Sequence, residues 1–198
     1  MTAAQATKDG HSRQAKKVLG THNLNGQRLG KKGRDTRERI VVAAQALLTG
    51  PRSTPITLSA VAREASLGMT SLYNYFGDLT ELLVAVLEPV TIEAHSAYID
   101  QLRTRWPDNA LDKKCLEFVT DFYNFWQRNT RVLHLRNSMA DQHDARMAQN
   151  RIEMATPVIR LIVEQMNHDT DALSTPAFGM ATVLYAGIER IVTIATDF

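Results

Sequence analysis

The stretch that decides the fold runs from Thr57 to Phe76 and reads TLSAVAREASLGMTSLYNYF. Thr57 is a good N-cap for a short helix. The inner face of this helix carries Leu58, Val61, Ala62 and Ala65. After an interruption at residues 66–68, a second short helix is predicted from about Met69 to Tyr75, with Met69, Leu72 and Phe76 on its buried side. Two short helices joined in this way have the form of a helix-turn-helix, although periodicity alone also fits a helical hairpin of any bundle.

Helices are predicted on both sides of this stretch as well. Upstream, apolar residues recur at i, i+3, i+4, i+7 and i+8, which predicts an amphipathic helix that starts near Arg34 and is stopped by Gly50 and Pro51. These residues are Ile40, Ala43, Ala44, Leu47 and Leu48. Downstream, Asp78 opens another helix as a capping box with Glu81. That helix continues through Leu82, Leu83, Val86 and Leu87.

The remaining sequence also predicts helix after helix. The expected segments are Ala110 to Asn129, Thr130 to Met139, Ala145 to Asn167 and an apolar one from about Thr175. Pro89 should kink or end the helix that Asp78 opens, and Pro157 falls where it can split the longest of the later helices. Because no run of alternating β-branched residues is long enough for a sheet, the predicted fold class is all-α.

Composition excludes several classes of protein. A lone cysteine, Cys115, excludes an internal disulfide framework and any multi-cysteine zinc module, and it fits a reducing interior. The first residues are polar and basic, which argues against a signal peptide. The longest uncharged stretch, residues 172–188, is short and carries Pro176, so no membrane segment is expected. We therefore expect a cytoplasmic protein with no cofactor and no metal.

Charge is unevenly distributed along the chain. The net charge is +2, but residues 1–39 carry +7 and the remainder −5. Residues 1–33 contain five of the ten glycines and show no sustained apolar period, so they are expected to form a flexible basic arm. A basic end on an acidic body indicates a polyanionic partner at that end, and a solvated tail without a partner is the alternative.

The stretch Thr36 to Val86 resembles the DNA-binding domain of TetR-family transcriptional regulators. The residues Thr70 to Phe76, TSLYNYF, are similar to the recognition-helix signature of that family: a small pair, Leu-Tyr, a variable residue, His or Tyr, then Phe. Residues Thr57 to Ala65 resemble the second helix of the family, and Asp78 to Leu83 the start of the fourth. The resemblance thus covers about fifty residues with three motifs in the family's order.

The resemblance implies a role for each matching position. Thr57 would contact the DNA backbone, Thr70, Ser71 and Asn74 would face the groove, and Tyr73 and Tyr75 would reach phosphates or thymine methyl groups. Leu72 and Phe76 would be core. Three positions depart from the family: Ser66 replaces the usual glycine of the turn, Gly68 replaces the usual serine cap, and Leu79 replaces a lysine that often contacts phosphate. The basic arm is a candidate replacement, with Lys31, Lys32, Arg34 and Arg37 entering the adjacent minor groove.

The candidate ligand site rests on an aromatic stripe in the predicted helix from Ala110 to Asn129. Phe118, Phe122, Phe125 and Trp126 share helical spacing, with Tyr123 to the side, and such a stripe fits either a plain core or an apolar ligand pocket. His134 and Arg136 are polar candidates nearby, and if they point inward they would suit an aromatic or acyl carboxylate. Asp141, His143 and Asp144 lack further metal ligands and are interpreted as a polar turn.

The last predicted helix, from Pro176 to Ala195, is apolar on more than one side and needs cover from outside its own core. Its small residues permit close helix approach, and the resemblance implies an intersubunit four-helix bundle, hence a twofold homodimer. The sequence ends within apolar residues at Phe198, and we expect a further helix beyond it.

These observations predict a basic arm over 1–33, a helix-turn-helix DNA-binding domain over 34–80, and a ligand-binding and dimerisation domain over 81–198. The expected function is that of a transcriptional repressor, not an enzyme, which a small apolar or aromatic ligand releases from a palindromic operator. An activator or an architectural DNA binder without an inducer remains open. A helical enzyme using Cys115 with His134 or His143 is disfavoured, because no nucleophile and base sit in a recognisable motif.

Overall fold

A computed structural model describes residues 28–50, 55–166 and 176–197, and within these ranges the chain is helical with no β-strand, which confirms the all-α prediction. The α-helices are α1 (Lys31–Thr49), α2 (Leu58–Glu64), α3 (Met69–Tyr73), α4 (Leu79–Ala94), α5 (Leu111–Arg128), α6 (Thr130–Asp141), α7 (Ala145–Gln165) and α8 (Pro176–Ala195). A π-helix, η1 (His95–Ile99), and two 3₁₀ turns, η2 (Asp100–Arg103) and η3 (Asp108–Ala110), join α4 to α5.

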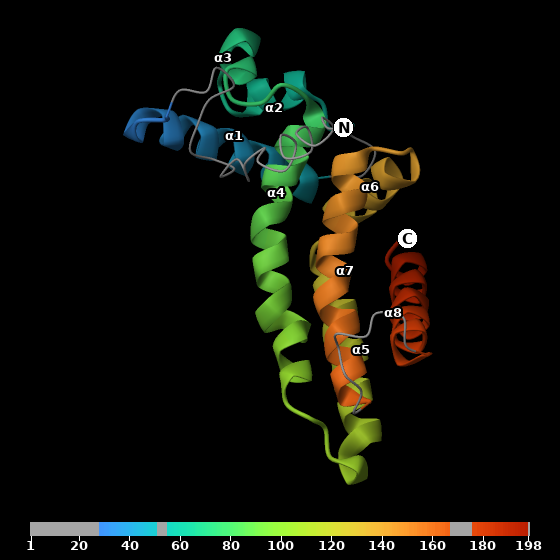
Figure 1. Ribbon diagram of the computed structural model, residues 1–198. Helices are drawn as coiled ribbons and strands as arrows, with labels where there is room; N and C mark the ends of the chain where they lie inside the picture. The colour runs from blue at the N-terminus through green and yellow to red at the C-terminus, as the bar shows by residue number, and fades with distance from the viewer. Residues whose placement is uncertain (1–27, 51–54, 167–175, 198) are drawn as a thin grey trace, which may run out of the picture.

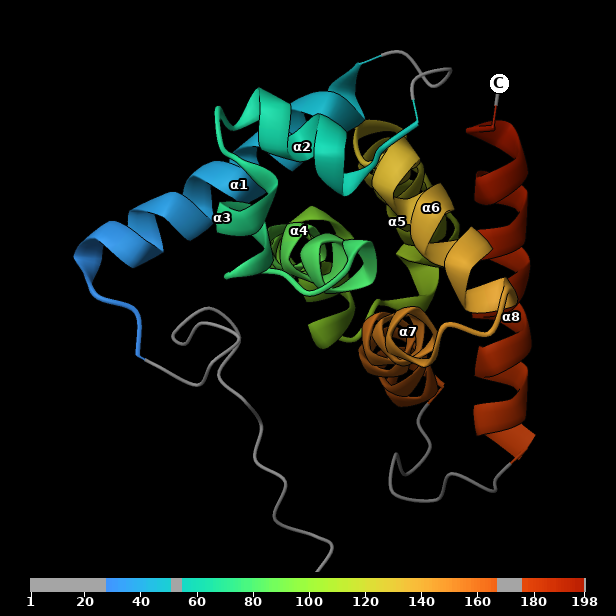
Figure 2. The ribbon, with the colours of Figure 1, turned by 90° about the horizontal axis from the view of Figure 1, so that it is seen from above.

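The helices divide into a head and a body. We call α1–α3 the head, which forms one end of the molecule, with α1 lying crosswise to the long helices (Figure 1). We call α5–α8 the body; α4 packs against α1 on one side and against α6 and α7 on the other. Seen along the long helices, α8 lies at the edge of the bundle (Figure 2). The helix α4 is therefore the element shared by head and body.

The helix α1 begins earlier than the periodicity predicts. It starts at Lys31 instead of Arg34, because Leu29 folds back onto Gly33, where a Cβ would lie only 2.9 Å from the Leu29 side chain. The Arg34 guanidinium donates to the Leu29 carbonyl oxygen at 2.8 Å, which holds this fold-back in place. The predicted arm boundary after residue 33 is corrected accordingly: Lys31 and Lys32 belong to the first turn of α1. Residues 1–27 of the predicted arm lie outside the described residues.

Neither proline ends its helix. Pro89 lies inside α4, which continues to Ala94, and Pro157 lies inside α7, which is unbroken from Ala145 to Gln165. A proline removes one backbone hydrogen bond from a helix interior. Both helices pack against several neighbours, α4 on α1, α6 and α7, and α7 on α4, α6 and α8, and this packing offsets the lost hydrogen bond.

The core of the body contains a cluster of aromatic rings from α5, η1 and α8. Tyr98 packs edge-on against Phe122 with ring centroids 4.8 Å apart, and it contacts Phe118 and Phe125 as well. Tyr185 of α8 packs edge-on against Phe122 from the other side. Edge-to-face pairs of this kind stabilise a core beyond the area they bury.

Two helical stretches are long and apolar enough to cross a membrane by length and composition alone. They are Leu79–Arg103 and Pro176–Ala195. The second extends past the uncharged stretch 172–188 and remains apolar on average despite Glu189 and Arg190. The expectation that the chain has no membrane segment stays a prediction. In the most apolar 18-residue part of the first stretch, 50% is buried inside the protein, as in a core helix. In the corresponding part of α8, only 22% is buried.

Candidate nucleic-acid interface

The helix α2 is fixed by its cap and its buried face, as the sequence predicts. Thr57 is extended, and its Oγ1 accepts a hydrogen bond from the Ala60 backbone N–H at 3.1 Å. Val61, Ala62 and Ala65 are buried against the rest of the head. The Thr57 side chain is exposed at the start of α2, where the helix presents unpaired N–H groups toward solvent.

The turn between α2 and α3 depends on one residue in an unusual conformation. Ser66 has a φ of 53°, in the left-handed region that glycine adopts without strain. The N–H of Leu67 donates to the Ala62 carbonyl at 2.8 Å, and the N–H of Ser66 donates to the Arg63 carbonyl at 3.1 Å. The conformation is thus the one expected at the position where the resemblance places a glycine, and here a serine adopts it.

The helix α3 buries one side and exposes the other. Leu72 is fully buried and Phe76, just beyond the helix, is 1% exposed, as predicted for core residues. Thr70, Tyr73 and Asn74 are exposed, with 48% of Tyr73 accessible. Among the other candidates, Ser71 and Tyr75 are half-buried, and Tyr75 packs partly against the core.

The structure corrects the predicted end of α3. The helix stops at Tyr73 instead of Tyr75, and Asn74 forms its C-cap. The N–H groups of Asn74 and Tyr75 make i to i+3 bonds to the carbonyls of Ser71 and Leu72. The Leu72 carbonyl also accepts from the Phe76 N–H at 3.1 Å, an i to i+4 bond. Gly68 caps the other end without a side-chain hydrogen bond, which leaves the first N–H groups of α3 without a side-chain partner from the cap.

The two candidate arginines of α1 both make contacts within the protein. Arg34 is exposed and donates to the Leu29 carbonyl, whereas Arg37 is half-buried with its guanidinium 5.0 Å from the centre of the Phe76 ring. Burial raises the pKa of the neighbouring Glu88, and the charge of Arg37 opposes this effect. Arg37 therefore holds α1 against the segment after α3, in addition to any contact outside the protein.

Neither family models nor curated proteins match the chain. Function is therefore inferred from the described residues and their geometry. The candidates Thr57, Thr70, Tyr73 and Asn74 are the exposed members of the predicted set in α2 and α3, and both helices lie at the head end of the molecule.

The aromatic stripe of α5 forms part of the core. Phe118, Phe122 and Trp126 are each at most 4% exposed and pack on one another or on Tyr98. Tyr123 is half-buried at the side of the stripe. Four clefts on the described part of the protein, of about 230 to 570 Å³, are lined by other residues. The ligand-binding role of the stripe stays a prediction.

The two polar ligand candidates occupy different environments. Arg136 is 2% exposed and donates to Glu189 Oε1 at 3.2 Å and to Asn137 Oδ1 at 2.9 Å, with Met154 Sδ 2.9 Å away. Burial lowers the pKa of Arg136, and Glu189 counteracts this. His134 is half-buried, with its Nε2 3.0 Å from Thr196 Oγ1. His134 and Glu189 line a cleft of about 570 Å³ between α6, α7 and α8, the largest of the four.

Sequence reasoning did not predict the contact through which Arg131 fastens the head to α6. The guanidinium of Arg131 donates to the carbonyl oxygens of Leu47 at 2.6 Å and Gly50 at 3.1 Å, at the C-terminal end of α1. A cation is favourable at this end, because the last carbonyls of a helix carry partial negative charge. No local signal identifies this contact, since more than eighty residues separate Arg131 from its acceptors.

Proposed function

We propose that this protein is a sequence-specific, DNA-binding transcriptional regulator of the TetR type, with α3 as the helix that enters the major groove. The observation that carries the proposal is the pair α2 and α3 around Ser66. Leu72 and Phe76 are buried on the inner side of this pair. Thr70, Tyr73 and Asn74 are exposed on its outer side, where they present a hydroxyl, a phenol and an amide to solvent. These groups are able to hydrogen-bond base edges and phosphates.

The direct test is the selection of bound sequences from a random pool of DNA duplexes, followed by footprinting of the selected site. Asn74→Ala and Tyr73→Ala should each weaken binding to that site and relax its sequence preference, by about 5- to 150-fold if one base contact is lost. Asn124→Ala is the matched control, because Asn124 is an exposed asparagine on α5 in the body. Equal, salt-sensitive binding to every duplex would overturn the proposal.

We further propose that the regulator is a homodimer that pairs through α8. The exposed face of α8 carries large apolar side chains that nothing else in the described chain covers. These are Met180, Val183, Leu184, Ile191 and Ile194, between 47% and 72% exposed. Gly179 and Gly187 have open space where a Cβ would stand, which allows a second helix to approach closely. Two copies of the head would then meet half-sites about 34 Å apart on DNA.

The dimer is tested by sedimentation of the full chain. Val183→Glu combined with Ile191→Glu should convert dimers to monomers, because each places a charge in the apolar contact. Ile92→Glu is the matched control, since Ile92 on α4 is 72% exposed, as is Val183. A monomeric parent chain, or a parent chain that binds lipid vesicles through α8, would contradict this assembly.

The effector proposed for a repressor is a small apolar or aromatic molecule bound in the body. Its test is a melting-temperature screen of aromatic and acyl carboxylates, followed by footprinting with any stabilising compound. One observation favours the second candidate, an activator or architectural DNA binder without an inducer: Phe118, Phe122 and Trp126 are buried and pack on one another. A selected operator that no compound releases would support this second candidate.

A further inference from the structure

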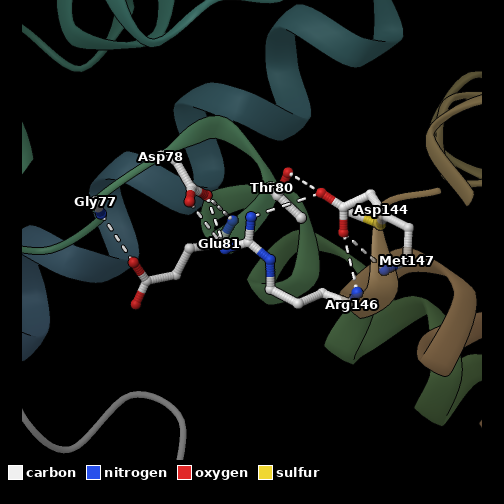
Figure 3. A network of polar contacts seen from close by, with 7 residues as sticks. All are labelled: Gly77, Asp78, Thr80, Glu81, Asp144, Arg146 and Met147. Atoms are coloured by element: carbon white, nitrogen blue, oxygen red, sulfur yellow. Dashed lines mark hydrogen bonds and ion pairs between the residues drawn. The ribbon is translucent and has the colours of Figure 1, made fainter. Parts of the chain in front are cut away.

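The first turns of α4 and α7 are joined by two aspartates that act as helix caps (Figure 3). Asp78 is the N-cap of α4, and its Oδ1 accepts from the Glu81 N–H at 2.7 Å. Asp144 is the N-cap of α7, and its Oδ1 accepts from the N–H groups of Arg146 at 3.0 Å and Met147 at 3.2 Å. Each carboxylate therefore satisfies the exposed N–H groups of its own helix.

Each cap also binds the second residue of the other helix. Arg146 donates from one guanidinium nitrogen to both carboxylate oxygens of Asp78, at 3.0 and 2.9 Å. In return, the Thr80 hydroxyl donates to Asp144 Oδ2 at 2.9 Å. Thr80 and Arg146 lie two positions after their respective caps, so the arrangement is reciprocal although 68 and 64 residues separate the partners. We call these four residues the cap joint.

The two halves of the cap joint differ in exposure. Thr80 is buried, at 6% exposed, and protects its bond to Asp144 from water. About half of the Asp78 and Arg146 side chains is accessible, so salt screens their attraction. Burial opposes ionisation of Asp78, but the hydrogen bonds from Glu81 and Arg146 hold its pKa below the ordinary value. Burial also opposes ionisation of Asp144, but hydrogen bonds from the Thr80 hydroxyl and from two backbone N–H groups of α7 hold its pKa below the ordinary value. Both carboxylates are therefore charged at neutral pH.

The cap joint stands next to the proposed reading helix. α3 ends at Tyr73, and only residues 74–78 connect it to the first residue of α4. Phe76 in this connection is buried and lies under the Arg37 guanidinium, so the connection is itself held against the head. The position of Asp78 relative to α7 therefore limits where α3 can lie relative to the body.

Resting on the proposed function of this chain as a DNA reader, we propose that Asp78, Thr80, Asp144 and Arg146 are positioning residues that set the orientation of α3 relative to the body. A shift of α7 along α4 breaks both cross-helix bonds and leaves each helix with its own cap. The cap joint would thus have a closed and an open arrangement. In the open one, the head would stay attached through the packing of α1 on α4 and through Arg131, while its orientation relative to α7 could change without unwinding either helix. In a dimer, the closed arrangement would fix the spacing between the two reading helices.

Two substitutions open the cap joint selectively. Asp78→Asn keeps a good N-cap residue but removes the charge that Arg146 binds. Thr80→Val keeps the shape of the side chain and removes the hydroxyl that donates to Asp144. The matched control is Asp141→Asn, because Asp141 pairs at 2.8 Å with Arg151, which is not one of the four residues of the cap joint.

The first measurement is the distance between head and body in the full chain. Spin labels are placed at Ala46→Cys on α1 and Arg160→Cys on α7, both exposed, in a Cys115→Ser background. Dilution with unlabelled protein isolates the distance within one chain. The parent and Asp141→Asn should give one narrow distribution. Asp78→Asn with Thr80→Val should add a second distance whose population rises by about fivefold for each bond lost. An unchanged distribution in this double variant would overturn the proposal.

The second measurement separates the cap joint from the proposed function. On a DNA site selected by the parent, the double variant should bind about 5- to 30-fold more weakly and should tolerate altered half-site spacing, with circular dichroism unchanged. Parent-like affinity and spacing preference in the double variant would contradict the positioning role. A parent that selects no DNA sequence would overturn the proposed function, whereas the distance measurement would still decide whether the cap joint holds head and body together.

Discussion

The head and the body are stabilised over different sequence distances. In α2 and the turn that follows it, polar groups are satisfied locally: the Thr57 hydroxyl accepts from the N–H three residues further on, and the turn at Ser66 closes onto Ala62 and Arg63. The end of α1 is the exception, because its last carbonyls accept from Arg131 of α6. In the body, the principal polar contacts join distant elements, as Arg136 does with Glu189 across 53 residues. A substitution in α2 or in the turn at Ser66 should therefore have a small, local effect, whereas one at a long-range contact of the body should affect the packing of several helices.

The largest expected effect is in the body. Glu189→Ala should lower the free energy of unfolding by about 3 kcal/mol, because it leaves the buried Arg136 charge without its counter-ion. Urea denaturation, monitored by circular dichroism, measures this loss in the free energy of unfolding. Adding Arg136→Met to Glu189→Ala should recover most of it, since the unpaired charge is then gone. If Glu189→Ala were as stable as the parent, the contrast between head and body would not hold.

A smaller effect is expected at the α2 cap in the head. Thr57→Ala should cost about 1 kcal/mol, because the Ala60 N–H loses its acceptor. Thr120→Ala on α5 is the matched control, since Thr120 is exposed within a helix and caps nothing; it should change the free energy of unfolding by no more than about 0.5 kcal/mol. Equal values for the two variants in urea denaturation would mean that the cap contributes nothing to the head.

A gain in stability is expected at the turn. Ser66→Gly should raise the free energy of unfolding by roughly 0.5 kcal/mol, because glycine relieves the left-handed strain but loses more chain entropy on folding. Ser138→Gly in α6 serves as the comparison and should cost a similar amount, since Ser138 lies within a regular helix. In thermal melting, Ser66→Gly should have a higher melting temperature than the parent and Ser138→Gly a lower one. A loss at Ser66 would show that the conformation there is not strained.

The smallest expected effect is the pH dependence of the cap joint. The pKa values of Asp78 and Asp144 are lowered in the folded protein below 3.8, so their contribution to stability is present above pH 3.8 and is lost as the pH falls through the folded values. Because Asp78 is half exposed, its share should be only about 0.3 kcal/mol at neutral pH. The difference in stability between the parent and Asp78→Asn should shrink as the pH falls below 3.8. A difference that persists there would contradict this assignment.

The sequence predicts the head closely because its signals are local. The caps Thr57 and Asp78, the interruption at Ser66 and the buried face of α1 follow from residues within a few positions of one another. The capping box at Asp78 is present in modified form, since the Glu81 carboxylate accepts from the Gly77 N–H instead of that of Asp78. The boundaries were less predictable: the Leu29 fold-back that starts α1 depends on a close approach that periodicity does not report.

The sequence predicts the body only in outline. Its helices were expected, but the partners of their polar residues were not. Asp144 was interpreted as part of a solvated turn, whereas it caps α7 and binds Thr80. The signal for the cap was present, because an aspartate directly precedes a long helical run, but nothing local indicates which distant side chain it meets. The spacing of the aromatic stripe likewise fits both a pocket and a core. Only the positions of Tyr98 and Tyr185, which both pack edge-on against Phe122, show how closely the rings of the stripe are packed.

The helix α4 belongs to both regions, which has a mechanical consequence. Its 16 residues span about 24 Å, so a tilt of about 5° at one end displaces the other by roughly 2 Å. A displacement of that size is several times the range of about 0.5 Å over which the donor–acceptor distance of a hydrogen bond varies. A small rearrangement where α4 meets η1 is thus amplified along this lever arm, and it would reach Asp78 as a movement large enough to make or break its contact with Arg146.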